Sequence, residues 1–242
     1  MRPTAFLACV FAALMWGGLS WSLWQSPFES FGMLLLAALG FFTGFMPRPI
    51  ESLLSIAFRA PTELSWWYKG GLPVRAWNYH KIQDGIYIGR VPRTDEDASE
   101  LKQKGIGAVL AVMEDWELCL DPMSWIAGDM SYKQLAVPDF CPPSMDQLAE
   151  GVQFLQEMIK EKRTVFVHCN GGKGRSVSVV LAYLMSTKAI DVEKALALVS
   201  AIRPVAKFKT LFGLKSQWQR LIEYDQQAHR QRHMAAIAKK AS

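Results

Sequence analysis

The chain has 242 residues, which is enough for one domain of medium size and an additional module. Half of the residues are hydrophobic and the mean hydropathy is slightly positive, which is high for a soluble enzyme and low for a polytopic membrane protein. The net charge of +5 suits phosphorylated or anionic lipid surfaces. The four cysteines have neither C-x-x-C spacing nor histidine partners at zinc spacing, which argues against a disulfide scaffold and against structural zinc.

The apolar residues are concentrated at the N-terminus, where residues 1–46 are predicted to form a transmembrane helical hairpin. The first span, residues 4–24, is long enough to cross about 30 Å of hydrocarbon. The second, residues 30–46, is near the short limit for a span. Two alternatives remain open: a cleaved signal peptide with Arg2 as its positive region, and one span followed by a re-entrant or interfacial segment.

The charges around this hairpin predict its orientation. Arg2 precedes the first span, and Arg48, Arg59 and Lys69 follow the second, whereas the short loop between the spans carries only Glu29. Basic residues that flank membrane spans face the cytoplasm. We therefore expect an integral membrane protein whose following domain lies on the cytoplasmic, reducing face of a lipid bilayer.

Residues 47–70 are interpreted as a connector at the membrane surface. Apolar residues at helical spacing are interleaved with Glu51 and Arg59, and the aromatic cluster Trp66-Trp67-Tyr68 follows. This pattern is typical of an amphipathic interfacial helix with an aromatic anchor. A helix packed on the core of the next domain is the equal alternative. Gly70-Gly71 marks the boundary of that domain.

Residues 71–225 are predicted to form an α/β domain with a single central sheet flanked by helices on both faces. The prediction depends on strand-like and helix-like segments that alternate along the chain. The strand-like segments are a hairpin at residues 79–88, a strand at 106–113, a strand that ends at 137 and a central strand at 164–167. The helix-like segments are residues 94–104, a helix that starts at 144, and three helices with an apolar stripe, of which one starts at about 176 and the others cover 195–202 and 211–222. Residues 226–242 form a basic tail without acidic residues, interpreted as a frayed or surface-bound helix.

One segment combines the features of an anion-binding turn: His168-Cys169-Asn170-Gly171-Gly172-Lys173-Gly174-Arg175-Ser176. It lies between the strand-like run 164–167 and a helix-like run that starts near Ser176. A strand, a glycine-rich turn and a helix N-terminus direct backbone N–H groups and the positive end of a helix dipole at one point. The predicted phosphate-binding loop consists of Asn170, Gly171, Gly172, Lys173 and Gly174.

Cys169 and Arg175 give this loop its chemistry. The helix dipole, the N–H groups and Arg175 all favour the thiolate, the reactive form of a cysteine whose pKa is otherwise about 8.5. Arg175 can bind two oxygens of a phosphate monoester at once, which lysine does less well. Attack by Cys169 on phosphorus would give a phosphocysteine that water later hydrolyses. The alternative, an inert cysteine buried at a strand end, leaves the glycines and the arginine unexplained.

Four further residues can be interpreted from the sequence: three within the same segment and one, Arg203, at the end of a later helix. His168 is interpreted as fixing the loop by hydrogen bonding, and a general base is the alternative. Ser176 either caps the following helix or hydrogen-bonds the cysteine sulfur. Lys173 points either at substrate phosphate or at water. Arg203 is interpreted as the end of its helix.

Acidic residues outside the loop supply further candidates. Asp139 follows a strand in a loop stiffened by three prolines, where a carboxylic acid could protonate a leaving oxygen and later activate water. A plain turn aspartate is the alternative. Glu114, Asp115 and Glu117 follow another strand. No second acidic cluster supports a metal site or a glycosidase pair, so neither a metal nor a cofactor is expected.

The pattern H-C-x5-R-[S/T] resembles the signature of the cysteine-based protein tyrosine and dual-specificity phosphatases. Further segments are similar to the mitochondrial-type dual-specificity phosphatases, a branch that includes phosphatidylglycerophosphate phosphatases. These segments are Trp77-Asn78-Tyr79-His80-Lys81-Ile82, Gly89-Arg90-Val91-Pro92, Met113-Glu114-Asp115-Trp116-Glu117 and Ile202-Arg203-Pro204, and the similarity covers roughly residues 75–225. The loop departs from that branch at Asn170, where lysine is usual. Lys173-Gly174 instead resembles the loop of phosphoinositide phosphatases.

The resemblance implies a dual-specificity phosphatase-like fold and adds two assignments in the site. Asp139 lies 30 residues before Cys169, a spacing similar to that in dual-specificity phosphatases. Glu114 or Glu117 is expected to orient the loop arginine through a salt bridge, with a solvated loop as the equal alternative.

We therefore expect a membrane-anchored, cysteine-dependent phosphomonoester phosphatase that forms a phosphocysteine without a metal. A lipid headgroup phosphate is the first expected substrate, with phosphatidylglycerophosphate before phosphoinositides. A protein tyrosine or serine/threonine phosphatase and a phosphate-binding membrane adaptor without turnover are the alternatives. The bilayer is an expected partner, and nucleic acid is not. A disulfide from Cys119 or Cys141 to an oxidised Cys169 also stays open.

Overall fold

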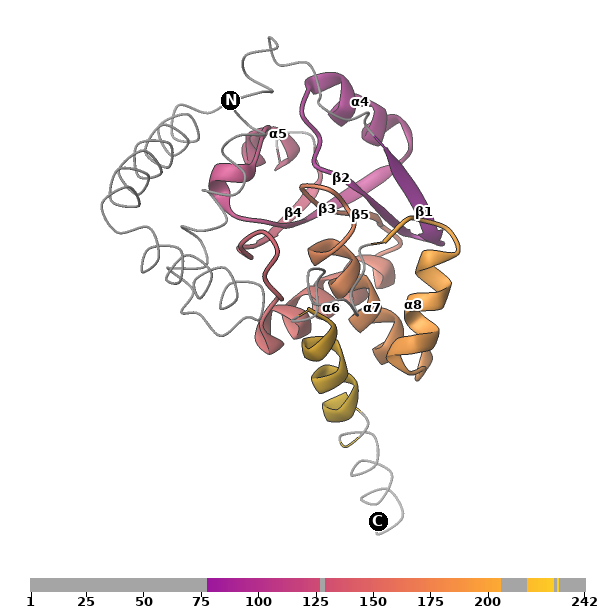
Figure 1. The fold of residues 1–242 in the computed structure, drawn as a ribbon. Helices are drawn as coiled ribbons and strands as arrows, with labels where there is room; N and C mark the ends of the chain where they lie inside the picture. Colours follow the sequence, from indigo (N-terminus) through magenta and orange to yellow (C-terminus); the bar gives the residue numbers. More distant parts are fainter. Residues whose placement is uncertain (1–77, 127–128, 206–216, 229, 231–242) are drawn as a thin grey trace, which may run out of the picture.

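The computed structural model describes residues 78–126, 129–205, 217–228 and 230 (Figure 1). Within these ranges, no helix combines the length and the apolar character that a membrane span needs. The predicted hairpin of residues 1–46, the connector of residues 47–70 and most of the tail of residues 226–242 lie outside the described residues.

A five-stranded mixed sheet forms the centre of the fold. Its strands are β1 (Tyr79–Gln83), β2 (Ile86–Arg90), β3 (Ile106–Val112), β4 (Ser131–Leu135) and β5 (Thr164–Cys169), in the spatial order β1-β2-β5-β3-β4. β1 pairs antiparallel with β2, and the other neighbours are parallel. The parallel strands therefore end at one edge of the sheet, where Cys169 lies opposite Arg90.

Helices cover both faces of the sheet, as the sequence predicts (Figure 1). The helices on one face are α6 (Met145–Lys160), α7 (Arg175–Lys188), α8 (Val192–Ser200) and a further helix of residues 217–228, and those on the other face are α4 (Asp95–Gln103) and α5 (Pro122–Ile126). Side chains of β5 alternate between the two layers. Val165 and Val167 pack in the cluster of α6, α7 and α8, whereas Phe166 packs with Leu101 and Trp125. The central strand is thus buried on both faces, which holds its C-terminal end rigidly.

Local sequence signals begin two of the helices. Thr94 accepts a hydrogen bond from the Asp97 N–H at the start of α4, and the Asp97 carboxylate accepts one from the Thr94 N–H. Ser144 and Gln147 make the same reciprocal pair at the start of α6. Each pair satisfies N–H groups that the first turn of a helix cannot bond internally.

Some features differ from the sequence-based prediction. The 3-10 helix η1 (Asp115–Glu117) and α5 were not predicted, because helices of three and five residues are too short to show a hydrophobic period. The apolar stripe around α8 is only partly core. Ala195 and Val199 are buried, but Leu198 and Ile202 are 46% and 42% exposed, because α8 lies at the edge of its helical layer (Figure 1).

Candidate active site

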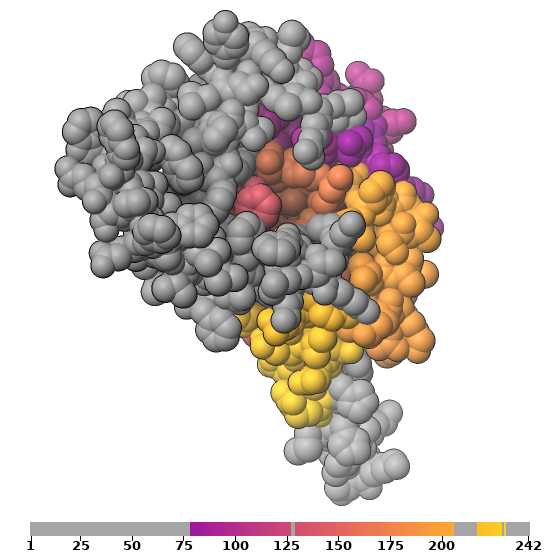
Figure 2. All heavy atoms as spheres, viewed as in Figure 1, coloured from indigo at the N-terminus to yellow at the C-terminus, as the bar shows by residue number. Residues whose placement is uncertain are grey.

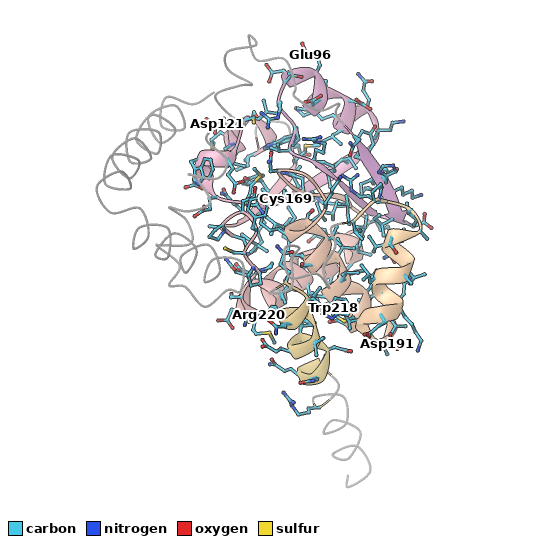
Figure 3. All side chains as sticks on the ribbon, in the orientation of Figure 1. Glu96, Asp121, Cys169, Asp191, Trp218 and Arg220 are labelled. Carbon is cyan, nitrogen blue, oxygen red and sulfur yellow. The ribbon has the colours of Figure 1, made fainter. Side chains whose placement is uncertain are left out.

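The predicted phosphate-binding loop connects the end of β5 to the start of α7, at the edge where the parallel strands end. Figure 3 places Cys169 near the centre of the described fold, and Figure 2 shows part of the β5–α7 segment at the surface between β1–β2 and α8. The Asn170 carbonyl accepts a hydrogen bond from the Val91 N–H at 3.3 Å, which ties the loop to the end of β2. α7 has no side-chain cap, so the first-turn N–H groups can bind an anion in the loop.

The Cys169 sulfur is buried and hydrogen-bonded at the start of the loop. Ser176 Oγ lies 3.3 Å from Cys169 Sγ, and the Ser176 backbone N–H also donates to the sulfur. Burial raises the pKa of the Cys169 thiol, but the charge of Arg175 and the Ser176 hydrogen bonds outweigh it. The pKa of Cys169 therefore lies below its ordinary value, and the thiolate is favoured. Ser176 contacts the sulfur and does not cap α7.

Arg175 is held in one orientation by a carboxylate from a distant segment. Its Nη1 donates to Glu117 Oε1 at 2.6 Å and its Nη2 donates to Glu117 Oε2 at 2.8 Å, a bidentate pair in which both side chains are almost fully buried. Nη1 also donates to the Val137 carbonyl at 2.7 Å. The structure thus places Glu117 on Arg175, whereas Glu114 accepts a hydrogen bond from Trp116 Nε1 at 3.0 Å. The second candidate orienter does not reach the arginine.

Asp139 lies beside the same guanidinium. Its Oδ1 is 3.0 Å from Arg175 Nη2, and the carboxylate side chain remains 18% exposed. The loop turns sharply after it, because Phe140 adopts a φ of +65°, and the Phe140 N–H donates to Asp139 Oδ1 at 3.0 Å. A bulky residue rarely adopts this left-handed conformation, so the turn is a local strain next to the carboxylate. The acid candidate therefore contacts the same arginine whose charge lowers the pKa of Cys169.

Gln217 hydrogen-bonds the loop that follows Asp139, and this role was not predicted from the sequence. Gln217 is 1% exposed. Its Nε2 donates to the Cys141 carbonyl at 2.9 Å, and its Oε1 accepts from Ser178 Oγ at 3.2 Å. The helix of residues 217–228 thereby connects the loop after Asp139 to α7. A single glutamine in an otherwise ordinary helical segment carries no pattern that indicates this contact.

His168 is buried next to the loop and is neutral. Burial, together with the positive charge of Arg175, lowers the pKa of His168 to about 3. The imidazole stacks on the Phe166 ring with centroids 5.5 Å apart, and its buried Nδ1 has no hydrogen-bond partner in the described part of the chain. An imidazole with so low a pKa is a poor base at neutral pH. The contact that the structure shows for this ring is the stacking on Phe166, and the predicted role of fixing the loop by hydrogen bonding stays a prediction.

A second arginine lies under the loop. Arg203, interpreted from the sequence as the end of a helix, is 1% exposed and donates to the carbonyls of both Gly171 and Gly172. The segment Ile202-Arg203-Pro204 was noted for its resemblance, but its position after α8 gives no sign that it reaches the loop. Lys173, by contrast, is exposed.

The acidic residues after β3 do not form a metal site. Glu117 binds Arg175, and Asp115 accepts a hydrogen bond from Gln134 Nε2 at 2.7 Å. Throughout the described ranges, no group of three or more histidine, cysteine, aspartate or glutamate side chains is arranged to hold a metal ion.

The sequence model of the family described as "Dual specificity phosphatase, catalytic domain" matches residues 86–227, which include Cys169, Arg175 and Asp139. The chain belongs to the dual-specificity phosphatase family.

Relatives of this dual-specificity phosphatase include proteins with lipid and with protein substrates in their names. Phosphatidylglycerophosphate phosphatase PTPMT1 of Arabidopsis thaliana is 27% identical over 164 residues, which are 67% of this chain and 43% of the relative. Phosphatidylglycerophosphatase and protein-tyrosine phosphatase 1 of Homo sapiens is 28% identical over 161 residues, 64% of this chain and 80% of the relative. Dual specificity protein phosphatase 12 of Mus musculus is 34% identical over 142 residues, which are 57% of this chain and 39% of the relative. The chain thus spans less than half of two of these relatives.

Solved structures share the phosphatase fold. Tk-PTP in its active form superposes with a TM-score of 0.55 and 28% identity, over 61% of this chain and 96% of that chain. PTPMT1 in complex with PI(5)P superposes with a TM-score of 0.55 and 23% identity, over 63% of this chain and 97% of that chain. The second likeness supports the fold alone.

Proposed function

We propose that this phosphatase is anchored in a membrane and hydrolyses a lipid headgroup phosphate through a phosphocysteine intermediate. One observation supports this chemistry. The Arg175 guanidinium, which Glu117 orients, lies 3.0 Å from the Asp139 carboxylate, and its charge lowers the pKa of Cys169. A phosphoryl group bound by Arg175 therefore has a nucleophile and an acid within reach.

The first step transfers the phosphoryl group to the enzyme. Arg175 and the loop N–H groups bind the nonbridging oxygens, which carry the negative charge of the transition state. The Cys169 thiolate attacks phosphorus, so that an S–P bond forms while the P–O bond to the leaving group breaks. Asp139 donates its proton to the leaving oxygen, which departs as an alcohol.

Substrate binding releases the Asp139 side chain from Arg175. A phosphate oxygen on Arg175 Nη2 takes the contact that Asp139 holds at 3.0 Å, so the Asp139 carboxyl group is left facing the leaving oxygen. The proton that Asp139 donates in this step is replaced in the next one, when it takes a proton from the attacking water.

The second step regenerates the enzyme. Asp139, now a carboxylate, takes a proton from a water molecule whose oxygen attacks phosphorus. The new O–P bond forms as the S–P bond breaks, the thiolate returns to Cys169, and inorganic phosphate leaves. No metal or cofactor takes part in either step.

The proposal of a lipid substrate is supported by three observations. Two of the relatives carry phosphatidylglycerophosphate hydrolysis in their names. The net charge of +5 suits an anionic lipid surface. The apolar segments of residues 1–46 would tether the enzyme to the surface that holds such a substrate, which raises its effective concentration. The match to dual specificity protein phosphatase 12 makes a phosphoprotein the second candidate.

A side-by-side turnover measurement tests the substrate. The full-length protein is given phosphatidylglycerophosphate in vesicles, phosphoinositides in the same vesicles, and soluble phosphotyrosine and phosphoserine peptides. We expect the highest kcat/KM for phosphatidylglycerophosphate. Faster turnover of the peptides would make the protein a protein phosphatase.

The control is Cys169→Ser, which should abolish turnover of every substrate and keep the affinity for inorganic phosphate. Residual turnover in this variant would exclude the phosphocysteine route. If the unaltered protein is no faster than Cys169→Ser on all of them, while both bind phosphate, the adaptor alternative is correct.

A further inference from the structure

Arg203 contacts the predicted phosphate-binding loop through the loop carbonyl groups. It follows α8, and its side chain is almost fully buried. Its Nε donates to the Gly172 carbonyl at 2.6 Å, and its Nη2 donates to the Gly171 carbonyl at 3.3 Å. Two consecutive peptide groups of the loop are thus held by one guanidinium.

These contacts determine where the loop N–H groups point. In a planar trans peptide, the carbonyl and the following N–H point in opposite directions. The Gly171 carbonyl points toward Arg203, so the Gly172 N–H points away from it. The Gly172 carbonyl also points toward Arg203, so the Lys173 N–H points away from it as well. Both N–H groups are therefore aimed at the other side of the loop, where the phosphoryl oxygens bind.

The rest of the guanidinium is equally fixed. Nη2 also donates to Asn78 Oδ1 at 2.9 Å, and Nη1 donates to His80 Nδ1 at 2.9 Å and to the Ile88 carbonyl at 3.2 Å. An arginine has five N–H donors, and each of the five has an acceptor. His80 Nδ1 must accept, because a guanidinium can only donate, so His80 is neutral here. Arg203 is therefore a rigid bracket between β1, β2 and the loop.

The charge of Arg203 differs from that of Arg175 in what surrounds it. Arg175 faces the carboxylates of Glu117 and Asp139, whereas the acceptors of Arg203 are carbonyls, an amide oxygen and an imidazole nitrogen, none of them charged. Burial lowers the pKa of Arg203, and attraction to the Cys169 thiolate opposes that shift. Among the residues that the structure describes, no carboxylate pairs with Arg203. Its positive charge therefore strengthens the dipoles of the loop carbonyls that it binds, and it attracts anions on the opposite side of the loop.

We propose that Arg203 is a positioning residue of the phosphatase site: it aims the Gly172 and Lys173 N–H groups at the phosphoryl oxygens and stabilises the Cys169 thiolate with its positive charge. The inference rests on the proposed phosphocysteine mechanism but on no particular substrate. Its readouts are the ionisation of the thiol and the binding of vanadate, a phosphate analogue, so a wrong lipid assignment leaves it untouched.

Two variants separate orientation from charge. Arg203→Met removes both, and we expect the pKa of Cys169 to rise by about one unit. We expect vanadate inhibition to weaken about tenfold and kcat/KM to fall about 100-fold. Arg203→Lys keeps the charge without the two-carbonyl grip, so it should restore most of the thiol pKa but little of the vanadate affinity.

A third variant changes only the charge balance. Asn78→Asp places a carboxylate on Arg203 Nη2 with nearly the same shape, so the loop stays in position. We expect the thiol pKa to rise while the protein remains folded. This variant keeps the proposal testable even if Arg203→Met does not fold.

The thiol pKa is measured from the pH dependence of iodoacetamide alkylation, followed on the peptide that contains Cys169. The matched control is Arg163→Met, because Arg163 Nη1 also donates to a backbone carbonyl, that of Gly107 at 3.4 Å, but at the opposite end of the sheet. Arg163→Met should shift neither readout. An unchanged alkylation profile and unchanged vanadate inhibition in folded Arg203→Lys and Asn78→Asp would reduce Arg203 to a structural residue and overturn the proposal.

Discussion

Arg175 and Glu117 form an ion pair with almost no solvent exposure, and such a pair is poor evidence of stability. Removing two charges from water costs several kcal/mol per ion, and their attraction only offsets that cost when the geometry is good. The two hydrogen bonds of 2.6 and 2.8 Å provide such a geometry. What the pair adds is direction, because a guanidinium fixed in advance need not reorganise when the phosphoryl group arrives.

Asp139 is the residue whose role depends most on the leaving group. Asp139→Asn cannot donate a proton, so turnover of an alkyl phosphate should fall about 100-fold or more, while p-nitrophenyl phosphate, whose leaving group needs no proton, should lose less than about tenfold. Steady-state kinetics on the two substrates measure the difference. Asp146→Asn, an exposed carboxylate at the start of α6, is the control. Equal slowing of both substrates would remove Asp139 from the acid role.

His168 should make stability depend on pH. The folded protein holds its pKa at about 3, against an ordinary value of 6.5, so between these values the unfolded chain binds a proton that the folded protein does not. The contribution is complete above about pH 6.5 and is lost as the pH falls, by up to about 5 kcal/mol near pH 3. Urea unfolding at pH 7, 6, 5 and 4 measures this decline. His168→Gln should flatten it, and a decline of the same size in that variant would assign it to other groups.

At the scale of elements, the turn between β5 and α7 requires glycine at one position and not at its neighbour. Gly172 has a φ of +61°, and a Cβ there would collide with the Gly89 carbonyl and with Arg203 Nη2. A Cβ on Gly171 would meet no atom within 4 Å. We expect Gly172→Ala to lower the free energy of unfolding by about 2–5 kcal/mol, and Gly171→Ala to change it by less than about 1 kcal/mol. Denaturant unfolding of the pair tests this, and similar losses would contradict it.

The elements that the sequence predicts well are those with a local signal. The strand before Cys169 and the long helices show continuous or periodic apolar residues, and Thr94 and Ser144 bond to side chains only three positions away. η1 and α5 are too short for any period, and the exposure of Leu198 and Ile202 depends on where the helical layer ends. Periodicity shows that a helix is amphipathic, but not how wide a face its neighbours cover.

The site divides in the same way. Cys169, Arg175 and the glycines lie within nine residues, so their pattern can be read directly. Glu117 is 58 residues from Arg175, and the sequence does not distinguish it from Glu114 as the partner of that arginine. The structure shows that Glu117 is the partner. Gln217 and Arg203 are 76 and 31 residues from the loop atoms that they hold. Contacts over such separations are made by tertiary packing, and one sequence carries no local trace of them.

At the scale of the whole molecule, the proposed membrane anchoring and its predicted orientation can be tested directly. We expect the catalytic domain to be protected when protease is added to intact cells or to sealed vesicles of the same orientation, because Arg48, Arg59 and Lys69 should stay on the cytoplasmic side. Permeabilisation should expose it. Immunoblotting for the domain measures protection, and the protein should remain in the membrane fraction after carbonate extraction. Cleavage from outside would reverse the orientation, and release by carbonate would remove the predicted spans.

The meeting of Gly89, Gly172 and Arg203 limits how this active site can be engineered. The nine residues from His168 to Ser176 form a continuous segment that could be moved to another protein. The orientation of two of their peptide groups, however, depends on Arg203, 31 residues after Gly172, and on Gly89 in β2. A host scaffold that receives this segment alone would inherit the reactive sulfur without the oriented amides. A transfer of the active site to another scaffold therefore has to include Arg203 and Gly89 together with the loop.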